Sequence, residues 1–228
     1  ILDSIRGEAE RIDRIVRGLL DYARPPSVGG GAAPAAEVVD RVRDLLESQG
    51  KLMGIDCTWD IDEAGAHMVE EPHRLEQGLM NLLLNAVEGV DAPAISVSLS
   101  EGEGDVVMMP RRRDDDPPGI NYMHRRRRAK DEEGVGSVSS AERLTIIDVS
   151  DNGPGVADEM AEHLFDPFFT TKAPGEGTGL GLSICARLVE GMGGDIAVER
   201  AAAGGARFVI RLPVMYDTLD ESTETENP

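Results

Sequence analysis

The chain has 228 residues and a formal net charge of −20, with 43 acidic against 23 basic residues. This length holds one full domain plus appendages, at roughly 100–200 residues per domain. Hydrophobic residues make up 40% and aromatic residues 4% of the chain, which predicts one aliphatic core surrounded by much polar chain. The negative charge argues against a general nucleic-acid binder, because contacts to phosphates need a basic surface.

The cysteines and the hydropathy of the chain indicate the compartment in which the protein works. Cys57 and Cys185 stand far apart in apolar patterns, so we expect buried small side chains in a reducing compartment, not a disulfide or a metal pair. No run of about 18 or more apolar residues occurs, so we expect no membrane-spanning segment in this chain and a cytoplasmic location. The chain begins at Ile1 and shows no signal peptide, so we expect a piece of a longer protein.

Residues 1–26 contain the clearest helical pattern. Pro25 and Pro26 end it, and residues 27–34 (SVGGGAAP) are predicted to form a flexible linker. Such a helix must bury its apolar stripe, which favours a helical bundle separate from the next domain over a single helix lying on that domain. The stripe is a heptad seam of residues spaced alternately four and three apart: Ile5, Ala9, Ile12, Val16, Leu19 and Ala23.

A second domain is predicted over residues 35–213. Its apolar residues alternate with the period of strands in some segments and of helices in others. The order of these segments predicts an α/β fold, a two-layer sandwich with helices on one face of a mixed sheet. The helices are predicted at 35–50, 72–90 and 182–192, and the strands at 55–61, 95–99, 144–149, 195–200 and 207–212, the last two joined by the turn 201–205.

Two segments do not fit a packed domain. Residues 101–141 carry eight basic and nine acidic residues, with prolines and few residues for a core. This composition predicts a solvated, disordered insertion, and a nuclear address or a nucleic-acid patch is the less favoured alternative. Residues 214–228 are predicted to form an acidic, disordered tail.

Two glycine clusters flank a connector between Leu144 and Ile184. DNGPG follows the end of a strand, and GEGTGLGLSI opens a helix. Glycines let backbone N–H groups approach phosphate oxygens, and a helix N-terminus adds the positive end of its dipole. The combination is typical of a nucleotide site, although DNGPG alone would be an ordinary turn and the second cluster alone a hinge.

Polar residues around these clusters could contact a nucleotide. A carboxylate at a strand end, Asp151, can accept a hydrogen bond from the exocyclic amine of adenine, whereas guanine presents an acceptor there. Asn81, Asn85 and Glu88 fall on one face of the helix predicted at 72–90. Their oxygens are ligands suited to Mg²⁺, although asparagines within helices are usually exposed or neutral for packing.

The connector itself contains LFDPFFTTK at residues 164–172. Three of the four phenylalanines of the chain, Phe165, Phe168 and Phe169, are predicted to anchor a loop that otherwise moves. The following Thr170, Thr171 and Lys172 can then supply hydroxyl groups and a cation near phosphate.

Four motifs in this order, NLLLNA, DNGPG, LFDPFFTTK and GTGLGLSI, resemble the N, G1, F and G2 boxes of sensor histidine kinases. The similarity extends to HRLEQGLMNLLLNAVEG before the first box and to RFVIRLP near the end. The opening helix, with ERIDRIVRGLLDYARP, resembles the second helix of the dimerisation and phosphotransfer domain of these kinases. The residues within these motifs are similar to those of the NtrB-like branch of the family.

The resemblance implies a Bergerat (GHKL) ATP-binding fold with ATP and Mg²⁺ as ligands. It implies that Asn85 is a catalytic residue that coordinates Mg²⁺ with help from Asn81, that Lys172 is catalytic, and that Asp151 recognises adenine. Gly153 and Gly155 would shape the adenine pocket, and residues 156–177 would form a lid. The residues around the phosphates would be Thr178, Gly179, Leu180, Gly181 and Leu182.

The reaction implied is transfer of the ATP γ-phosphoryl group to a histidine and then to an aspartate on a response regulator, in a homodimer formed by the N-terminal helix bundle. The four histidines, His67, His73, His124 and His163, lack the setting of a phosphoacceptor, which we expect to precede Ile1. One alternative is a hydrolytic ATPase of the same superfold, although those enzymes carry a glutamate where Asn81 stands. Another is a degenerate nucleotide-binding module used for interaction.

Overall fold

The computed structural model describes residues 31–62, 68–89, 94–102, 143–172 and 177–214, together with Val16. Apart from Val16, the helix predicted over residues 1–26 lies outside the described residues, as do the first four residues of the predicted linker. So do most of the predicted insertion and the acidic tail from residue 215 onward. The fold below is therefore that of the second predicted domain.

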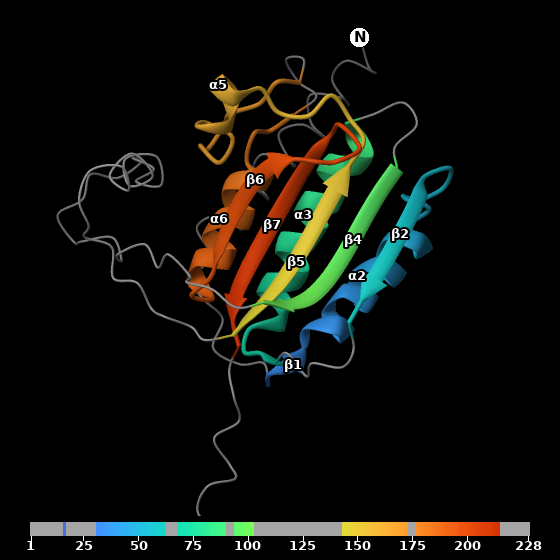
Figure 1. Ribbon diagram of the computed structural model, residues 1–228, viewed down its shortest axis with the longest axis vertical. Helices are drawn as coiled ribbons and strands as arrows, with labels where there is room; N and C mark the ends of the chain where they lie inside the picture. Colours follow the sequence, from blue (N-terminus) through green and yellow to red (C-terminus); the bar gives the residue numbers. More distant parts are fainter. Residues whose placement is uncertain are drawn as a thin grey trace, which may run out of the picture.

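One mixed sheet forms the first layer of the molecule (Figure 1). Its strands lie in the order β2-β4-β5-β7-β6, with β2 parallel to β4 and all other neighbours antiparallel. The sheet is mixed, as the order of the elements predicts. Its members are β2 (Asp56–Ile61), β4 (Ala94–Gly102), β5 (Leu144–Asp151), β6 (Asp195–Arg200) and β7 (Ala206–Pro213).

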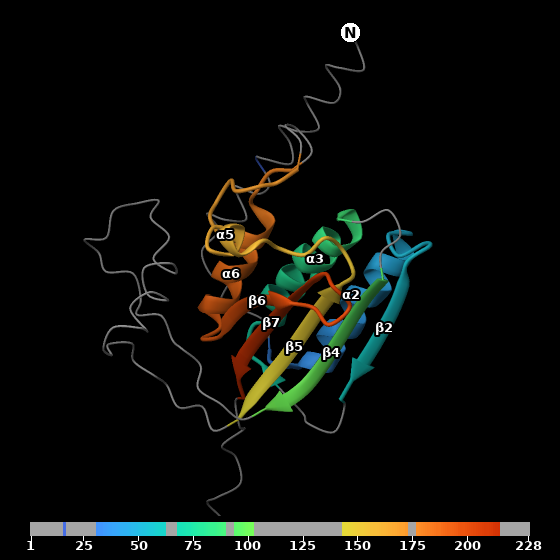
Figure 2. The same ribbon diagram turned by 45° about the horizontal axis from the view of Figure 1, so that its top comes forward.

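Three helices form the second layer, all on one face of the sheet (Figure 2). They are α2 (Ala35–Ser48), α3 (Pro72–Glu88) and α6 (Gly181–Gly191), and a short helix α5 (Asp158–Ala161) lies in the connection between β5 and α6. The predicted α/β two-layer sandwich is confirmed. No helix in the described part of the chain has both the length and the apolar character of a membrane span.

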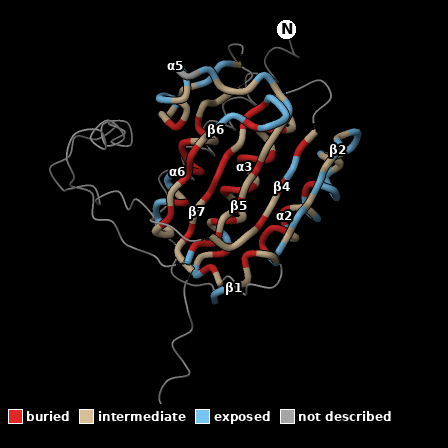
Figure 3. Tube along the Cα trace, in the orientation of Figure 1, coloured by how far each residue is buried: buried red, intermediate tan, exposed pale blue. Residues whose placement is uncertain are grey.

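The core lies between the two layers, because the alternation along each strand sends one set of side chains toward the helices. Ile147 and Val149 of β5 are at most 1% exposed, and so are Leu79, Leu82 and Leu83 of α3. Buried residues accordingly concentrate on the central strands and on the helix faces opposite them, whereas the β2 edge and the α5 region are more exposed (Figure 3). Pro72 occupies the first turn of α3, where its missing N–H leaves no helix bond unmade.

The two cysteines have different surroundings. Cys185 is fully buried in α6 and faces Gly78 of α3, and burial raises the pKa of its thiol to about 12. Cys57 is only partly buried, and its pKa is raised by burial and by nearby carboxylates, chiefly Asp56. Both are free thiols. The prediction of burial is thus right for Cys185 and only partly right for Cys57.

The sandwich includes pairings that periodicity did not predict. A two-residue strand, β1 (Ala33–Pro34), pairs with β3 (Met68–Val69), so the end of the predicted linker belongs to a small second sheet. β4 continues through Glu101 and Gly102, which lie within the predicted insertion. Their pairing with β5 and an ion pair between Glu101 and Arg143 extend the ordered hairpin by these two residues.

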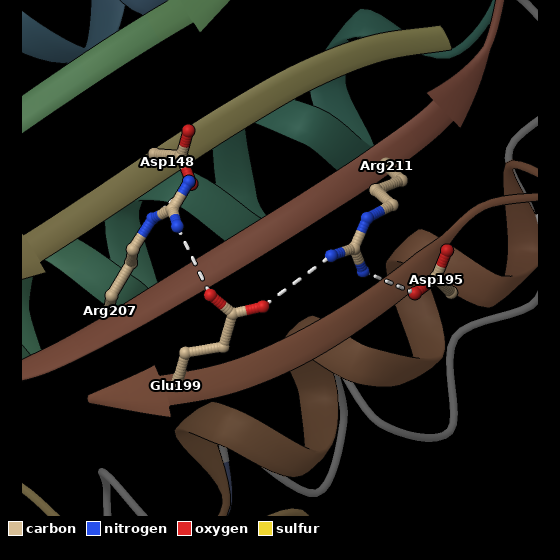
Figure 4. Close-up of polar contacts among 5 residues, drawn as sticks. All are labelled: Asp148, Asp195, Glu199, Arg207 and Arg211. Atoms are coloured by element: carbon tan, nitrogen blue, oxygen red, sulfur yellow. Dashed lines mark hydrogen bonds and ion pairs between the residues drawn. The ribbon is translucent and has the colours of Figure 1, made fainter. Parts of the chain in front are cut away.

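The sheet face away from the helices carries a network of five charged side chains (Figure 4). Arg207 donates to Asp148 at 2.8 Å and to Glu199 at 3.1 Å, and Arg211 donates to Asp195 at 3.1 Å. Arg207 lies directly across from Glu199 and Arg211 from Asp195 in the β6–β7 register. Opposite charges in such cross-strand positions stabilise the hairpin by about 0.2–1 kcal/mol per pair.

Candidate nucleotide-binding site

The residues predicted to bind a nucleotide gather at one end of the sandwich. The C-terminal end of β5, the β6–β7 turn and the segment that contains α5 all lie at the upper end of the sheet in Figure 1. The C-terminal part of α3 and the start of α6 reach the same end behind the sheet (Figure 2). Residues far apart in the sequence are therefore neighbours here.

Asp151 ends β5 and is held by two backbone donors. Its Oδ1 accepts hydrogen bonds from Gly153 N at 2.8 Å and from Ala206 N at 3.2 Å. Its Oδ2 accepts no hydrogen bond from any residue that the structure describes. One oxygen of the carboxylate thus fixes the side chain, and the other is available to a ligand.

The β6–β7 turn packs against the first glycine cluster. A side chain at Gly205 would overlap the backbone oxygen of Asp151, so only glycine fits there. Gly155 has φ +74°, and a Cβ on it would lie 3.3 Å from the carbonyl oxygens of Gly204 and Gly205. The part that the turn glycines play at this end of the sheet was not predicted from the sequence, because glycines are common in hairpin turns of any kind.

Asn152 is a second residue whose role was not predicted from the sequence. Its Oδ1 accepts a hydrogen bond from the backbone N of Ala94, at the start of β4, at 2.8 Å. Ile95 pairs with Asp151 in the neighbouring strand. Asn152 therefore fastens the end of β5 to β4 and helps to hold Asp151 in place.

The asparagine face of α3 meets the start of α6. A Cβ built on Gly181, the first residue of α6, would lie 3.6 Å from Asn85 Nδ2 and 4.0 Å from Asn81 Oδ1. Asn81 Nδ2 is buried and has no hydrogen-bond partner among the described residues. Because a buried amide donor without a partner is costly, its presence here favours a role that a bound ligand or water completes.

The second glycine cluster has one position that only glycine can occupy. Gly179 has φ +65°, its carbonyl oxygen accepts a hydrogen bond from Phe168 N at 2.9 Å, and a side chain on it would overlap the backbone of Phe168. Thr178 Oγ1 accepts a hydrogen bond from Leu180 N at 3.4 Å. Leu180 is only 2% exposed and Leu182 packs against the core, so both side chains anchor the cluster.

The three phenylalanines of the connector behave differently. Phe165 is buried, as an anchor should be, and the Phe169 ring lies 6.2 Å from the His163 ring between centroids. Phe168 instead is 61% exposed and has φ 69°, a strained value for a residue other than glycine. The prediction of an anchoring role is therefore right for Phe165 and wrong for Phe168.

Lys172 reaches α3. Its Nζ lies 2.5 Å from Glu88 Oε2, in the last turn of that helix. Glu88 shares a helix face with Asn85, three residues before it, so Lys172 is within about one helical turn of the asparagine. The cation predicted near phosphate thus contacts the helix that carries the two asparagines, and a carboxylate is its partner.

Two glycine substitutions separate the folding role of the second cluster from its binding role. We expect Gly179→Ala to lower the melting temperature, because it forces a side chain into a left-handed residue and into Phe168. Gly181→Ala should keep the melting temperature, since a Cβ at this first helical residue would meet only ordinary contacts at 3.6 Å or more. Its methyl group would cover the asparagine face, so nucleotide affinity should fall. Thermal melts and calorimetric titration measure the two effects.

The donor chemistry at this end fits a metal ion that arrives with a nucleotide. Among the described residues, no group of three or more histidine, cysteine, aspartate or glutamate side chains could hold a metal by itself. The amide oxygens of Asn81 and Asn85 are hard donors, and Mg²⁺ is commonly bound by one or two protein oxygens together with phosphates and water. These residues therefore fit Mg²⁺ bridged to phosphates.

The sheet is mixed and is covered by helices on one face. A carboxylate stands at the end of one strand, and a glycine cluster opens a helix that faces two asparagines. This arrangement is that of an ATP-binding sandwich of the Bergerat class. The family model described as "Histidine kinase-, DNA gyrase B-, and HSP90-like ATPase" matches residues 70–215. The chain belongs to this family.

Individual relatives of the chain are histidine kinases. The sensor histidine kinase ZraS of Escherichia coli O157:H7 is 29% identical over 214 residues, which are 93% of this chain and 38% of ZraS. AtoS, a signal transduction histidine-protein kinase of Escherichia coli K12, is 25% identical over 93% of this chain and 29% of its own length. The chain thus spans well under half the length of these relatives.

Solved structures show the same fold. The catalytic domain of histidine kinase ThkA is 26% identical with a TM-score of 0.54, covering 80% of this chain and 96% of that one. ThkA in complex with the response regulator TrrA gives a TM-score of 0.62 at 24% identity, covering 94% of this chain and 50% of that one. The second likeness shows the fold alone.

Proposed function

We propose that this chain binds ATP with Mg²⁺ and transfers the γ-phosphoryl group to a histidine of the kinase, from which it passes to an aspartate of a response regulator. The observation that carries the proposal is the meeting of the Asn81–Asn85 face of α3 with Gly181 at the start of α6. This junction brings oxygen ligands for a metal next to a helix N-terminus that favours phosphate.

Each part of the ligand has a matching part of the site. Asp151 would accept a hydrogen bond from the adenine amine through Oδ2, beside the turn formed by Gly153 and Gly155. Asn85, assisted by Asn81, would hold Mg²⁺, which neutralises charge on the phosphates. The segment 178–182 would line the phosphates, under a lid over residues 156–177.

The chemistry of the asparagine face favours transfer over hydrolysis. A general base must accept a proton from water, which a carboxylate can do and a neutral amide cannot. Asn81 stands at the position where the hydrolytic members of this fold carry a glutamate. Without that base, bound ATP should persist until a histidine is presented.

The partners follow from the proposed reaction. The helix predicted over residues 1–26 would form the dimer bundle with a second copy, and the acceptor histidine would lie in the other helix of that bundle. ThkA is known in complex with the response regulator TrrA, and we propose a response regulator as the next acceptor here. The domain would act in the cytoplasm, which supplies ATP.

The function is tested by mixing this chain with a separate phosphotransfer bundle, such as that of ZraS, and ATP labelled at the γ-phosphate. We expect label on the bundle that is lost in acid and kept in base, as for phosphohistidine. A bundle with its acceptor histidine changed to glutamine is the control. ATP binding without any labelling would contradict the kinase proposal, and steady ATP turnover by the chain alone would favour the hydrolytic alternative.

A further inference from the structure

Lys172 and Glu88 form an ion pair that joins the connector to α3. Lys172 Nζ lies 2.5 Å from Glu88 Oε2, and the two residues are 84 positions apart in the sequence. The side chains are 30% and 54% exposed. Because exposed ion pairs are weak and screened by solvent, this pair can be broken by a stronger anion at little cost.

The rest of Lys172 is fixed more firmly than its charged head. Its backbone N donates to Thr170 Oγ1 at 3.2 Å. Gly177, in the second glycine cluster, packs so closely that a Cβ on it would lie 3.3 Å from both Cβ and Cδ of Lys172. The backbone and the near part of the stem are therefore held beside the glycine cluster, and the ammonium group at the end can change partners by rotation about the last bonds of the side chain.

Glu88 holds that ammonium group next to the site of phosphate binding. Asn85 and Glu88 are three residues apart on α3, which places their side chains on one face about 5–6 Å apart at Cβ. Gly181 contacts the same face at Asn85. The Lys172 side chain thus runs from beside Gly177 in the glycine cluster to Glu88 on the helix that carries the asparagines. Under the proposed function, the outer phosphate of a nucleotide would be placed near this connection.

We propose that Glu88 is the resting partner of Lys172 and that the γ-phosphate of a bound nucleoside triphosphate takes Lys172 from it. This rests on the proposed function. Glu88 is then a positioning residue that acts through Lys172 and sets the preference for ATP over ADP. It keeps the lysine at the site before nucleotide binds, and it competes with the phosphate for the same cation.

The proposal predicts a specific pattern of affinities, measured by calorimetric titration of the whole chain with AMP-PNP and with ADP, each with Mg²⁺ at fixed ionic strength. Glu88→Gln removes the competitor, so affinity for AMP-PNP should rise about two- to fivefold. Affinity for ADP, which lacks the γ-phosphate, should stay unchanged. Lys172→Gln should weaken AMP-PNP binding and spare ADP. In the double variant the gain from Glu88→Gln should disappear.

Glu76→Gln is the matched control, because it removes the same charge from α3 in its first turns, where Glu76 faces Arg41. It should leave the ratio of the two affinities unchanged. Three results would overturn the proposal: no gain in AMP-PNP affinity from Glu88→Gln, an equal gain for ADP, or the same gain in the Lys172→Gln background. Binding of ADP in any of these cases would leave the proposed function standing. A wild-type chain that binds neither nucleotide would overturn both.

Discussion

Replacing Asn85 with alanine should lower phosphoryl transfer by about 100-fold or more, because a metal ion at the phosphates contributes several kcal/mol of charge stabilisation and each 1.36 kcal/mol is a factor of ten. Asn85 is the asparagine whose amide faces Gly181 at the start of α6. Its loss would remove the proposed metal ligand and no part of the apolar core, since the buried face of α3 consists of other residues. Labelling of a phosphotransfer bundle over a range of Mg²⁺ concentrations measures the loss.

The companion variant for this experiment is Asn85→Asp, which keeps an oxygen donor at the same position. It should retain more activity than the alanine variant, and its Mg²⁺ requirement should differ from that of the wild type. Melting temperatures close to the wild-type value in both variants would show that the fold is kept. Transfer by Asn85→Ala at the wild-type rate would remove Asn85 from the metal site.

The second large effect concerns recognition of the base. Asp151→Asn should weaken ATP binding by about 100-fold, since a site built to pair with a hydrogen-bonding group loses strongly when its partner becomes mismatched. The substitution can keep Oδ1, which accepts from Gly153 N and Ala206 N, and it replaces only Oδ2. An NH₂ group would then face the adenine amine, donor against donor. Calorimetric titration with ATP and with GTP measures the effect.

Asp151→Ala is the informative comparison, because it removes both oxygens. It should lower the melting temperature as well as ATP affinity, since it leaves two part-buried backbone N–H groups without their acceptor. Asp151→Asn should lower affinity without a comparable loss of thermal stability. If Asp151→Asn bound ATP normally, the carboxylate would have a purely structural role in the turn.

The spacing of apolar residues along the sequence predicted most of the helices and strands. The alternation in residues 144–149 places Ile147 and Val149 in the core, and the leucine spacing after Pro72 marks the buried face of α3. These patterns depend only on the period of a strand or a helix, so they can be read without a structure. The short strands β1 and β3 escaped prediction because two residues are too few to show any period.

The sequence motifs indicate which residues are candidates for the site, but they do not predict which of these residues contact one another. The glycine clusters and the asparagine face are visible in the sequence, but the approach of Gly181 to Asn85 depends on how α6 packs on α3. The Lys172–Glu88 pair joins residues 84 positions apart, and no local rule relates them. The positive φ of Phe168 likewise occurs where its N–H donates to Gly179 O, a contact that the loop sequence does not show.

The pairing of β4 with β5 allows the connection between these two strands to vary in length. Gly102 pairs with Leu144, and Glu101 forms an ion pair with Arg143, so the strands are already joined where residues 103–142 leave and rejoin the sheet. This junction lies at the opposite end of the sheet from Asp151 (Figure 1). Because the cost of closing a loop grows only slowly with its length, residues can be gained or lost there while the strand register that positions Asp151 is kept. Residues can thus be inserted between β4 and β5 without moving the residues at the other end of the sheet, where the nucleotide site is proposed.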